Sequence, residues 1–351
     1  MPSMSAYKKL VRDTNATPDS RWTNGKFKGF SCGGYRGADG TVRAQRLHTL
    51  SEFQRLAEMG ANHLRVSCYF DETGVDTWIY NTNADDLAYL DFFIASCASC
   101  GMSVVPVFGL IGNYGGITDY WGQVKTKQSV ALIFQILAEK YKDNKTVVGF
   151  DLFNEQVLTM GYLDAAWNDL ASCWVSAIRS KDPNRTVIIE ALDYGNPNKF
   201  DTYTPIAFDN IVYSAHIYQP MTFTHQGLYA YPMLTQAGGD NLYPGIVQDT
   251  FTWNKEHLST AIYQSLRNFK AKYNVPIWVG EFSCIYYADP DSRYNYIKDH
   301  LDLITAEGYN WAFQSQGDYI GWDFRYQKVE NQGAVIPVPN NKLENLIRSY
   351  L

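Results

Sequence analysis

The sequence Val-Val-Gly-Phe-Asp-Leu-Phe-Asn-Glu, at residues 147–155, contains the unit from which the fold can be inferred. Residues 147–153 are mostly apolar and have the length of a strand buried on both faces, as strands of a parallel sheet are. Two polar residues, Asn154 and Glu155, follow the end of this predicted strand. Eight apolar runs of this kind occur along the chain, at residues 27–32, 63–69, 103–108, 147–153, 186–191, 211–217, 276–282 and 310–314.

Segments with helical periodicity separate these apolar runs. In residues 46–59 the apolar side chains recur at the spacing of one helix face, and Gly60 follows as a stop signal. Residues 192–210 are the weakest helix candidate, because their Gly, Pro and Asn residues favour a short or irregular connection. The other predicted helical segments are 85–99, 123–142, 162–180, 253–273, 291–306 and 339–351.

Strict alternation of strands and helices predicts parallel strands, and eight such units close naturally into a (β/α)8, or TIM, barrel. We expect residues 1–26 to form an N-terminal leader and residues 27–351 to form one barrel domain. An open doubly wound sheet is the alternative fold. However, residues 31–37 lack the glycine spacing of a dinucleotide-binding loop, and the chain has no Walker sequence. Residues 219–252, after the sixth strand, should form a wall of a cleft.

Charge and composition argue against several classes of protein. The chain of 351 residues has a net charge of −6 with scattered Lys and Arg, so we expect no nucleic-acid partner. No apolar run approaches the roughly 20 residues of a membrane span. We expect no metal or other cofactor, since His-x-His and His-Glu-x-x-His spacings are absent. Cys97 and Cys100 have no second pair for a zinc site, and a serine nucleophile is not expected.

Polar residues stand at the carboxyl ends of several predicted strands, where barrels of this kind carry their function. Glu155 follows the fourth strand, Glu281 lies near the end of the seventh, Arg65 lies in the second, and His216 and Tyr218 stand at the end of the sixth. Two carboxylates across a barrel mouth suit glycosidic bond cleavage, in which one protonates the leaving oxygen and the other attacks the sugar. We expect Arg65 to keep Glu281 charged, and a less polar site to raise the pKa of Glu155.

Each of these residues also has a structural explanation when it is taken alone. A single Glu at a strand end is more often a surface residue, and a single buried His is more often part of the core. The combination of both glutamates with Asn154 and Tyr218, each on the correct strand, favours the functional interpretation. We expect Asn154 to bind a sugar hydroxyl, and His216 and Tyr218 to hold the two carboxylates. Aromatic residues make up 15% of the chain, and several adjoin polar loop residues where they could stack on sugar rings.

These residues together resemble glycoside hydrolase family 5, which includes many endo-β-1,4-glucanases and β-mannanases. The resemblance extends over residues 27–325. It rests on Arg65, on the sequence 149–155 that ends in Glu155, on His216 and Tyr218, and on Glu281 in Trp-Val-Gly-Glu-Phe. It implies a retaining mechanism without a metal, with Glu155 as general acid/base and Glu281 as nucleophile. It also implies an extracellular or cell-surface enzyme, although residues 1–9 lack the apolar segment of a signal peptide.

Two positions depart from the family pattern. Residues 106–110 lack the His that the family commonly has near the end of the third strand. Gln314 stands three residues after Trp311, where the family usually has a Trp. Trp322 or Tyr114 could supply a replacement stacking surface. Residues 223–227 resemble a feature of some bacterial relatives, which implies that His225 and Gln226 bind sugar.

The leading hypothesis is therefore an endo-acting hydrolase of a β-linked polysaccharide or oligosaccharide, with β-1,4-glucan as the first candidate. Mannan, mixed-linkage glucan and bacterial exopolysaccharide are close alternatives, because specificity resides in loops. We expect the protein to act as a monomer. A hypothesis from another class is a non-catalytic carbohydrate-binding barrel, which the two departures at the third and eighth strands motivate. Transglycosylation is a third possibility, since a sugar can intercept a covalent intermediate in place of water.

Overall fold

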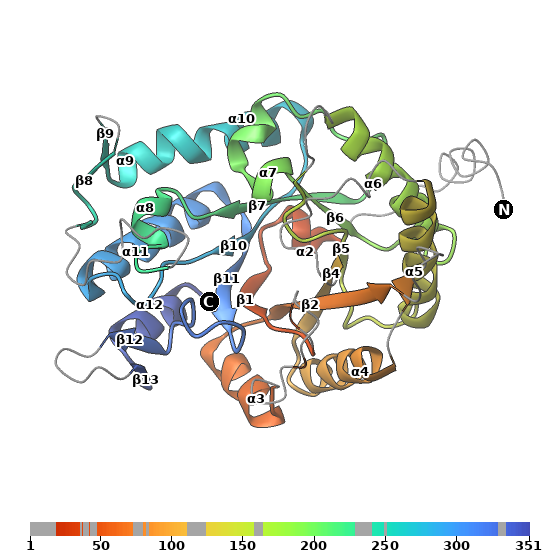
Figure 1. The fold of residues 1–351 in the computed structure, drawn as a ribbon, viewed down its shortest axis with the longest axis horizontal. Helices are drawn as coiled ribbons and strands as arrows, with labels where there is room; N and C mark the ends of the chain where they lie inside the picture. The colour runs from red at the N-terminus through yellow and green to blue at the C-terminus, as the bar shows by residue number, and fades with distance from the viewer. Residues whose placement is uncertain are drawn as a thin grey trace.

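The computed structural model contains a closed barrel of eight parallel strands, with helices on its outside (Figure 1). β1 pairs with both β2 and β11, and this double pairing closes the sheet. The barrel strands are β1 Lys28–Cys32, β2 His63–Glu72, β4 Ser103–Leu110, β5 Phe150–Asp151, β6 Val187–Glu190, β7 Ile211–Ile217, β10 Ile277–Phe282 and β11 Asn310–Gln316. The structure describes residues 19–35, 37, 42, 48–72, 80–81, 84–110, 124–157, 164–228, 241–248, 251–328 and 335–351.

Helices connect successive barrel strands, as the alternation in the sequence predicts. They are α3 Leu50–Met59, α4 Ala84–Ser99, α5 Val124–Tyr141, α6 Asp164–Arg179, α10 Gln264–Tyr273, α11 Pro290–Glu307 and the terminal α12 Lys342–Tyr350. The connection from β7 to β10 also includes the short helices α8 Met221–Thr224 and α9 Lys255–Leu258, and the antiparallel strands β8 Ile246–Gln248 and β9 Phe251–Trp253. Within the described part of the chain, no helix combines the length and the apolar character needed to cross a membrane.

The connection from β6 to β7 is irregular, as the sequence of residues 192–210 predicts. It contains the single turn α7 Leu192–Gly195 and the 3₁₀ helix η4 Pro197–Asp201 in place of a long helix. Inside α7, Asp193 and Tyr194 have φ angles of 63° and 62°, which lie in the left-handed region that side chains other than glycine seldom adopt. The chain after β6 therefore turns sharply, and both residues line the cleft described below.

A small apolar cluster, which includes Trp22, Phe27 and Trp278, lies in the barrel interior at the amino ends of the strands. Trp22, in the short helix α2 Ser20–Thr23, is 1% exposed and packs against Phe27 and Trp278. Its indole Nε1 donates to the Val148 carbonyl oxygen at 3.2 Å. Trp22 therefore packs against barrel residues, although the expected boundary at residue 27 places it in the N-terminal leader.

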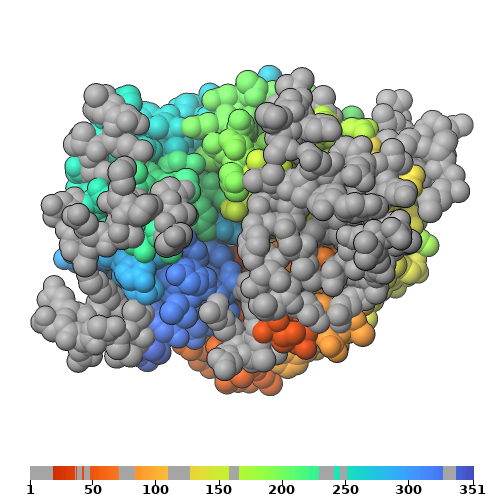
Figure 2. All heavy atoms as spheres, in the orientation of Figure 1, coloured from red at the N-terminus to blue at the C-terminus, as the bar shows by residue number. Residues whose placement is uncertain are grey.

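A contact between helices α3 and α12 joins the first and last strand–helix units of the barrel. The Arg55 guanidinium in α3 forms an ion pair of 2.6 Å with Glu344 in α12, whose side chain is 1% exposed. In the space-filling view, the blue C-terminal segments lie against the orange-red segments of the N-terminal part (Figure 2). Helices α3 and α12 therefore lie beside each other on the outside of the barrel.

Candidate active site

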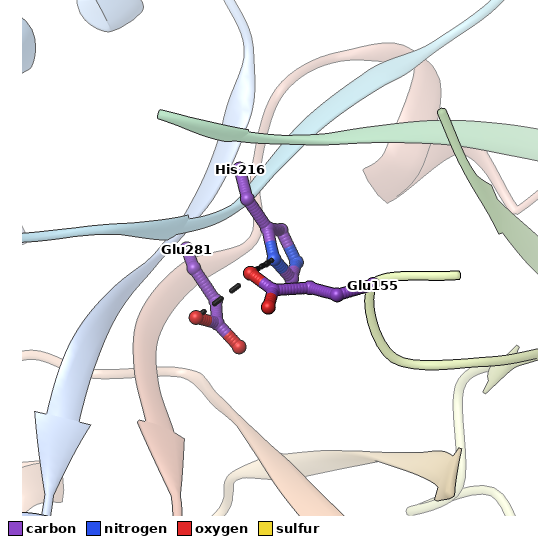
Figure 3. A group of neighbouring side chains, drawn as sticks. All are labelled: Glu155, His216 and Glu281. Atoms are coloured by element: carbon purple, nitrogen blue, oxygen red, sulfur yellow. Dashed lines mark hydrogen bonds and ion pairs between the residues drawn. The ribbon is translucent and has the colours of Figure 1, made fainter. Parts of the chain in front are cut away.

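Glu155, His216 and Glu281 meet at the carboxyl ends of the barrel strands (Figure 3). One carboxylate oxygen of each glutamate and one ring nitrogen of His216 lie within 4.8 Å of one another. His216 Nδ1 is 2.7 Å from Glu155 Oε1 and 3.8 Å from Glu281 Oε2. The barrel thus brings together two glutamates that are far apart in the sequence, and their carboxyl groups face each other.

Glu281, in β10, receives a hydrogen bond on each carboxylate oxygen. Arg65 Nη1 donates to Oε1 at 2.5 Å, and the Tyr218 hydroxyl donates to Oε2 at 2.7 Å. Arg65 is completely buried, and carboxylates around it raise the pKa of its guanidinium above the usual value, against the effect of burial. The two donors stabilise negative charge on Glu281 and fix its orientation, as a nucleophile requires.

Glu155 lies four residues after the end of the short strand β5 Phe150–Asp151, and its side chain is 23% exposed. Burial raises the pKa of its carboxyl group, the His216 hydrogen bond and charge oppose that rise, and the charge of Glu281 adds to it. Its backbone φ of 54° is in the left-handed region, a conformation that strained residues at functional sites often adopt. A carboxyl group with a raised pKa, aimed at the cleft, has the properties of a general acid.

His216 lies inside the barrel in β7 and is 2% exposed. Burial alone would lower the pKa of its imidazole, but the nearby carboxylates, led by Glu190 and Glu281, raise it well above the usual value. Gly280 makes room for this ring, because a Cβ there would lie 3.2 Å from His216 Nε2 and 2.6 Å from Ser214 Oγ. The Arg65 guanidinium, bound to Glu281 at 2.5 Å, places a positive charge beside this cluster that opposes binding of a divalent cation.

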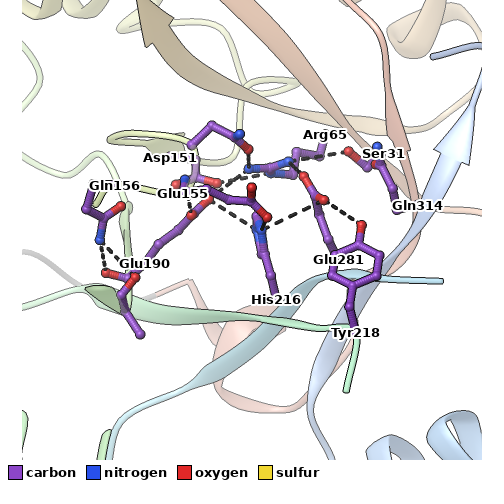
Figure 4. A network of polar contacts seen from close by, with 12 residues as sticks. Ser31, Arg65, Asp151, Glu155, Gln156, Glu190, His216, Tyr218, Glu281 and Gln314 are labelled. Carbon is purple, nitrogen blue, oxygen red and sulfur yellow. Dashed lines mark hydrogen bonds and ion pairs between the residues drawn. The ribbon is translucent and has the colours of Figure 1, made fainter. Parts of the chain in front are cut away.

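Two further carboxyl groups support the site, and the sequence interpretation missed both. Asp151 Oδ2 accepts from Arg65 Nε at 3.1 Å, and Glu190 Oε1 accepts from Arg65 Nη2 at 2.8 Å (Figure 4). Both side chains are completely buried. A signal was present, because acidic residues inside apolar strand runs are costly unless they are paired. Asp151 lies within residues 147–155, and Glu190 ends the run Val-Ile-Ile-Glu.

Ser31 also contacts Arg65, and its local sequence has the spacing of a serine hydrolase nucleophile. Residues 29–33, Gly-Phe-Ser-Cys-Gly, have the Gly-x-Ser-x-Gly spacing of a nucleophile elbow. Ser31 lies within β1 instead of on a strand-to-helix turn, and it is 2% exposed. Its hydroxyl accepts a hydrogen bond of 3.4 Å from Arg65 Nη1. Ser31 therefore supports Arg65 and lacks the exposure that a nucleophile needs.

A cleft of about 690 Å³ opens above the two glutamates. Trp322 contacts the rings of His225 and Tyr218, at centroid distances of 4.8 and 5.4 Å. Burial lowers the pKa of His225 to about 4, so this ring is neutral at neutral pH. The lining residues include Ser67, Tyr69, Asn154, Glu155, Asp193, Tyr194, Asn196, His216, Tyr218, Gln219, Met221, His225, Glu281, Gln314, Asp318 and Trp322.

The remaining predicted site residues differ in where the structure places them. Gln314 lines the cleft, and its amide nitrogen donates to Asp318 Oδ2 at 3.1 Å. Gln226 is 5% exposed and donates to the Phe223 carbonyl, and the cleft lining does not include it. Trp311 is fully buried in the hydrophobic core and packs near Phe282, so it does not reach the cleft. Tyr114 lies outside the described residues.

A (β/α)8 barrel with two facing glutamates at the carboxyl ends of its strands defines a class of enzyme, the barrel glycosidases. The sequence model of the cellulase family, glycosyl hydrolase family 5, matches residues 19–324. The chain therefore belongs to glycosyl hydrolase family 5 and is a glycoside hydrolase. This assignment removes the non-catalytic binding protein as an explanation of the fold and sequence.

Known proteins that are similar to this chain carry the names of enzymes acting on glucans. Endoglucanase C of Acetivibrio thermocellus is 24% identical over 73% of this chain and 80% of its own length. Cellodextrinase A of Ruminococcus flavefaciens is 23% identical over 82% of this chain and 84% of its own length. The structure of the endoglucanase Cel5A from Thermotoga maritima superimposes with a TM-score of 0.72, at 20% identity, over 88% of this chain and 94% of that protein. That enzyme has been solved with cellobiose and with mannotriose.

Proposed function

We propose that this enzyme is a retaining endo-β-glycosidase that hydrolyses β-1,4-glucan, with Glu155 as general acid/base and Glu281 as nucleophile. The observation that carries the proposal is the proximity of the two carboxylates, with one oxygen of each within 4.8 Å of the other. Retaining enzymes hold these groups about 5–5.5 Å apart, whereas inverting enzymes need about 6.5–9.5 Å to admit a water molecule. The short separation favours direct attack by a carboxylate.

In the first step, a carboxylate oxygen of Glu281 attacks the anomeric carbon, and the bond from that carbon to the leaving oxygen breaks. Glu155 gives its proton to the leaving oxygen, so the departing sugar leaves as an alcohol. In the second step, water attacks the anomeric carbon of the glycosyl ester, Glu155 takes the proton of that water, and Glu281 leaves as a carboxylate. Two inversions at the same carbon retain the β configuration.

The electrostatics of the pair suit these alternating roles. The negative charge of Glu281 helps to raise the pKa of Glu155, so Glu155 holds its proton while Glu281 is free. Formation of the glycosyl ester removes that charge, and the pKa of Glu155 then falls. The same carboxyl group is therefore an acid in the first step and a base in the second.

Several residues of the cleft are proposed to bind the sugar. The Oδ1 atom of Asn154 accepts a hydrogen bond of 2.8 Å from Arg65, which leaves its amide NH₂ to donate to a hydroxyl. Trp322, with Tyr218 and His225 beside it, offers a ring for stacking on the apolar face of a sugar. Gln314 offers an amide where the family usually has an indole, so hydrogen bonding replaces stacking at that position.

The choice of β-1,4-glucan rests on the similar proteins, which are named endoglucanase and cellodextrinase. Mannan is a second candidate, because the Thermotoga maritima enzyme has been solved with mannotriose as well as cellobiose. A polymeric substrate cannot cross a membrane, and this supports action outside the cell.

The proposal is tested by incubating the enzyme with carboxymethyl cellulose, mixed-linkage glucan, mannan and a bacterial exopolysaccharide, and measuring new reducing ends. We expect the highest rate on a β-1,4-linked glucan, with a mixture of oligosaccharide lengths from the first minutes. Cleavage of mannan alone, or release of a single short product from chain ends, would reject the substrate or the endo mode respectively.

A further inference from the structure

Glu190, at the carboxyl end of β6, contacts residues that bind both catalytic glutamates. We propose that Glu190 is a positioning residue that aligns Glu155 and Glu281 together, through Arg65 on one side and through His216 and the Glu155 backbone on the other. This inference rests on the catalytic roles proposed above. It concerns a residue that contacts neither the cleft nor the reacting atoms, and whose effect is transmitted by its neighbours.

The two carboxylate oxygens of Glu190 have different partners (Figure 4). Oε1 accepts a hydrogen bond of 2.8 Å from Arg65 Nη2 and lies 3.2 Å from His216 Nε2 in an ion pair. Oε2 accepts a hydrogen bond of 2.7 Å from the Glu155 backbone N–H. Arg65 holds the nucleophile and His216 holds the acid/base, so one buried carboxylate connects both sides of the reaction centre.

The partners of Glu190 explain why this position needs a carboxylate. All three neighbouring groups are hydrogen-bond donors when His216 is protonated, and only a carboxylate offers two acceptor oxygens without a competing donor. A glutamine amide would turn an NH₂ group toward one of these donors. The hydrogen bond to Glu155 N–H also stabilises the backbone where φ is 54°, the conformation that directs the Glu155 side chain toward His216.

The charges around His216 support a specific effect of Glu190 on its protonation. His216 faces Glu155 at the end of β5, Glu190 in β6 and Glu281 in β10, and these carboxylates oppose the effect of burial on its pKa. Glu190 is the leading charge among them, and it keeps its own pKa below the usual value against burial because His216 and Arg65 lie beside it. Removal of the Glu190 charge should therefore lower the pKa of His216.

Asp151 provides a matched control on the neighbouring strand. It is also completely buried and also binds Arg65, through Nε at 3.1 Å, but its contacts include neither His216 nor the Glu155 backbone. Burial and the charge of Glu190 raise its pKa above the usual value, while the ion pair with Arg65 opposes that rise. E190Q and D151N thus make the same chemical change next to the same arginine, with different consequences for His216.

The first experiment measures the His216 titration by NMR in histidine-labelled E190Q, D151N and parent enzyme without substrate. H216N identifies the resonance, and circular dichroism verifies that each variant is folded. We expect the E190Q midpoint to move to lower pH, and the D151N midpoint to move less, because Glu190 is the leading charge on His216 and Asp151 makes no contact with that ring. An unchanged His216 midpoint in folded E190Q would overturn the proposal. E190D keeps the charge, so its His216 midpoint should remain as high as that of the parent. This variant is titrated if E190Q is too unstable.

The second experiment compares kcat for cellotetraose with kcat for 2,4-dinitrophenyl β-cellobioside, whose leaving group departs without a proton. We expect E190Q to lose about 10²-fold on cellotetraose and at least tenfold less on the activated substrate, because misalignment of the acid matters only for the former. D151N should lose equally on both. If E190Q lost the same factor in kcat on both substrates, Glu190 would have only a structural role. A parent enzyme inactive on both glucosides would reject the proposed function, and the NMR titration would still test Glu190.

Discussion

Replacement of Arg65 by lysine tests how strongly the active site depends on a single guanidinium. Arg65 makes five hydrogen bonds, to Asp151, Ser31, Glu281, Asn154 and Glu190. A lysine ammonium has three donors on one atom, so at least two bonds are lost, at about 0.5–1.5 kcal/mol each. Its single nitrogen cannot reach all three carboxylates, and a buried charge left without its partner costs about 3–5 kcal/mol. The lost bonds are part of what leaves that charge unpaired, so the two costs overlap and are not added. We therefore expect R65K to lower the free energy of unfolding by about 3–5 kcal/mol.

The measurement is urea unfolding followed by tryptophan fluorescence, with the slope of the transition compared between variants. The control is K342A, which removes an exposed ion pair with Asp291 and should produce no measurable change. R65K should also lower kcat strongly, because Glu281 loses its donor at 2.5 Å. If R65K unfolded within about 1 kcal/mol of the parent at the same slope, the network around Arg65 would not have the energetic role assigned to it.

Three further predictions concern the acid and the cleft. E155Q should reduce kcat on cello-oligosaccharides by roughly 10²–10⁴-fold in a reducing-end assay, and a variant as fast as the parent would eliminate Glu155 as the acid. The activity of the parent should fall as pH rises through the pKa of Glu155, which lies above its usual value. Because the His216 contact lowers that pKa, H216N should move the alkaline limb of the kcat/KM profile to higher pH, and a shift to lower pH would contradict the assignment. W322A should raise KM for cellotetraose roughly 2- to 12-fold if its ring stacks on sugar, at about 0.5–1.5 kcal/mol, and an unchanged KM would exclude that contact.

The barrel could be predicted from the sequence because its strands are buried on both faces. The runs at 63–69, 211–217 and 276–282 are rich in apolar residues, and the structure confirms a strand at each. The strand within 147–153 is confirmed but has only two residues in the ladder, Phe150 and Asp151. Apolar character identifies burial, whereas the number of paired residues depends on how neighbouring strands are staggered around the barrel.

The candidate site could be predicted only where the residue and its strand-end position pointed the same way. Glu155 follows the run 147–153, and Glu281 is the penultimate residue of the run 276–282, so both properties were visible. Glu190 has the same penultimate position in the run 186–191, and the same criterion could have identified it. Asp151 lies inside the run 147–153, and its pairing with Arg65 depends on three-dimensional contacts between strands far apart in the sequence. Gln226 was predicted from a local resemblance, and the sequence alone could not tell that its amide bonds to the backbone of its own turn.

The configuration of the first product tests the central claim most directly. Proton NMR of an oligosaccharide digest, recorded before mutarotation, distinguishes the two anomers at the new reducing end. Attack by Glu281 followed by water predicts that the β anomer appears first and the α anomer only as the solution equilibrates. Initial release of the α anomer would mean that water attacks directly, and it would contradict the role of Glu281 as nucleophile.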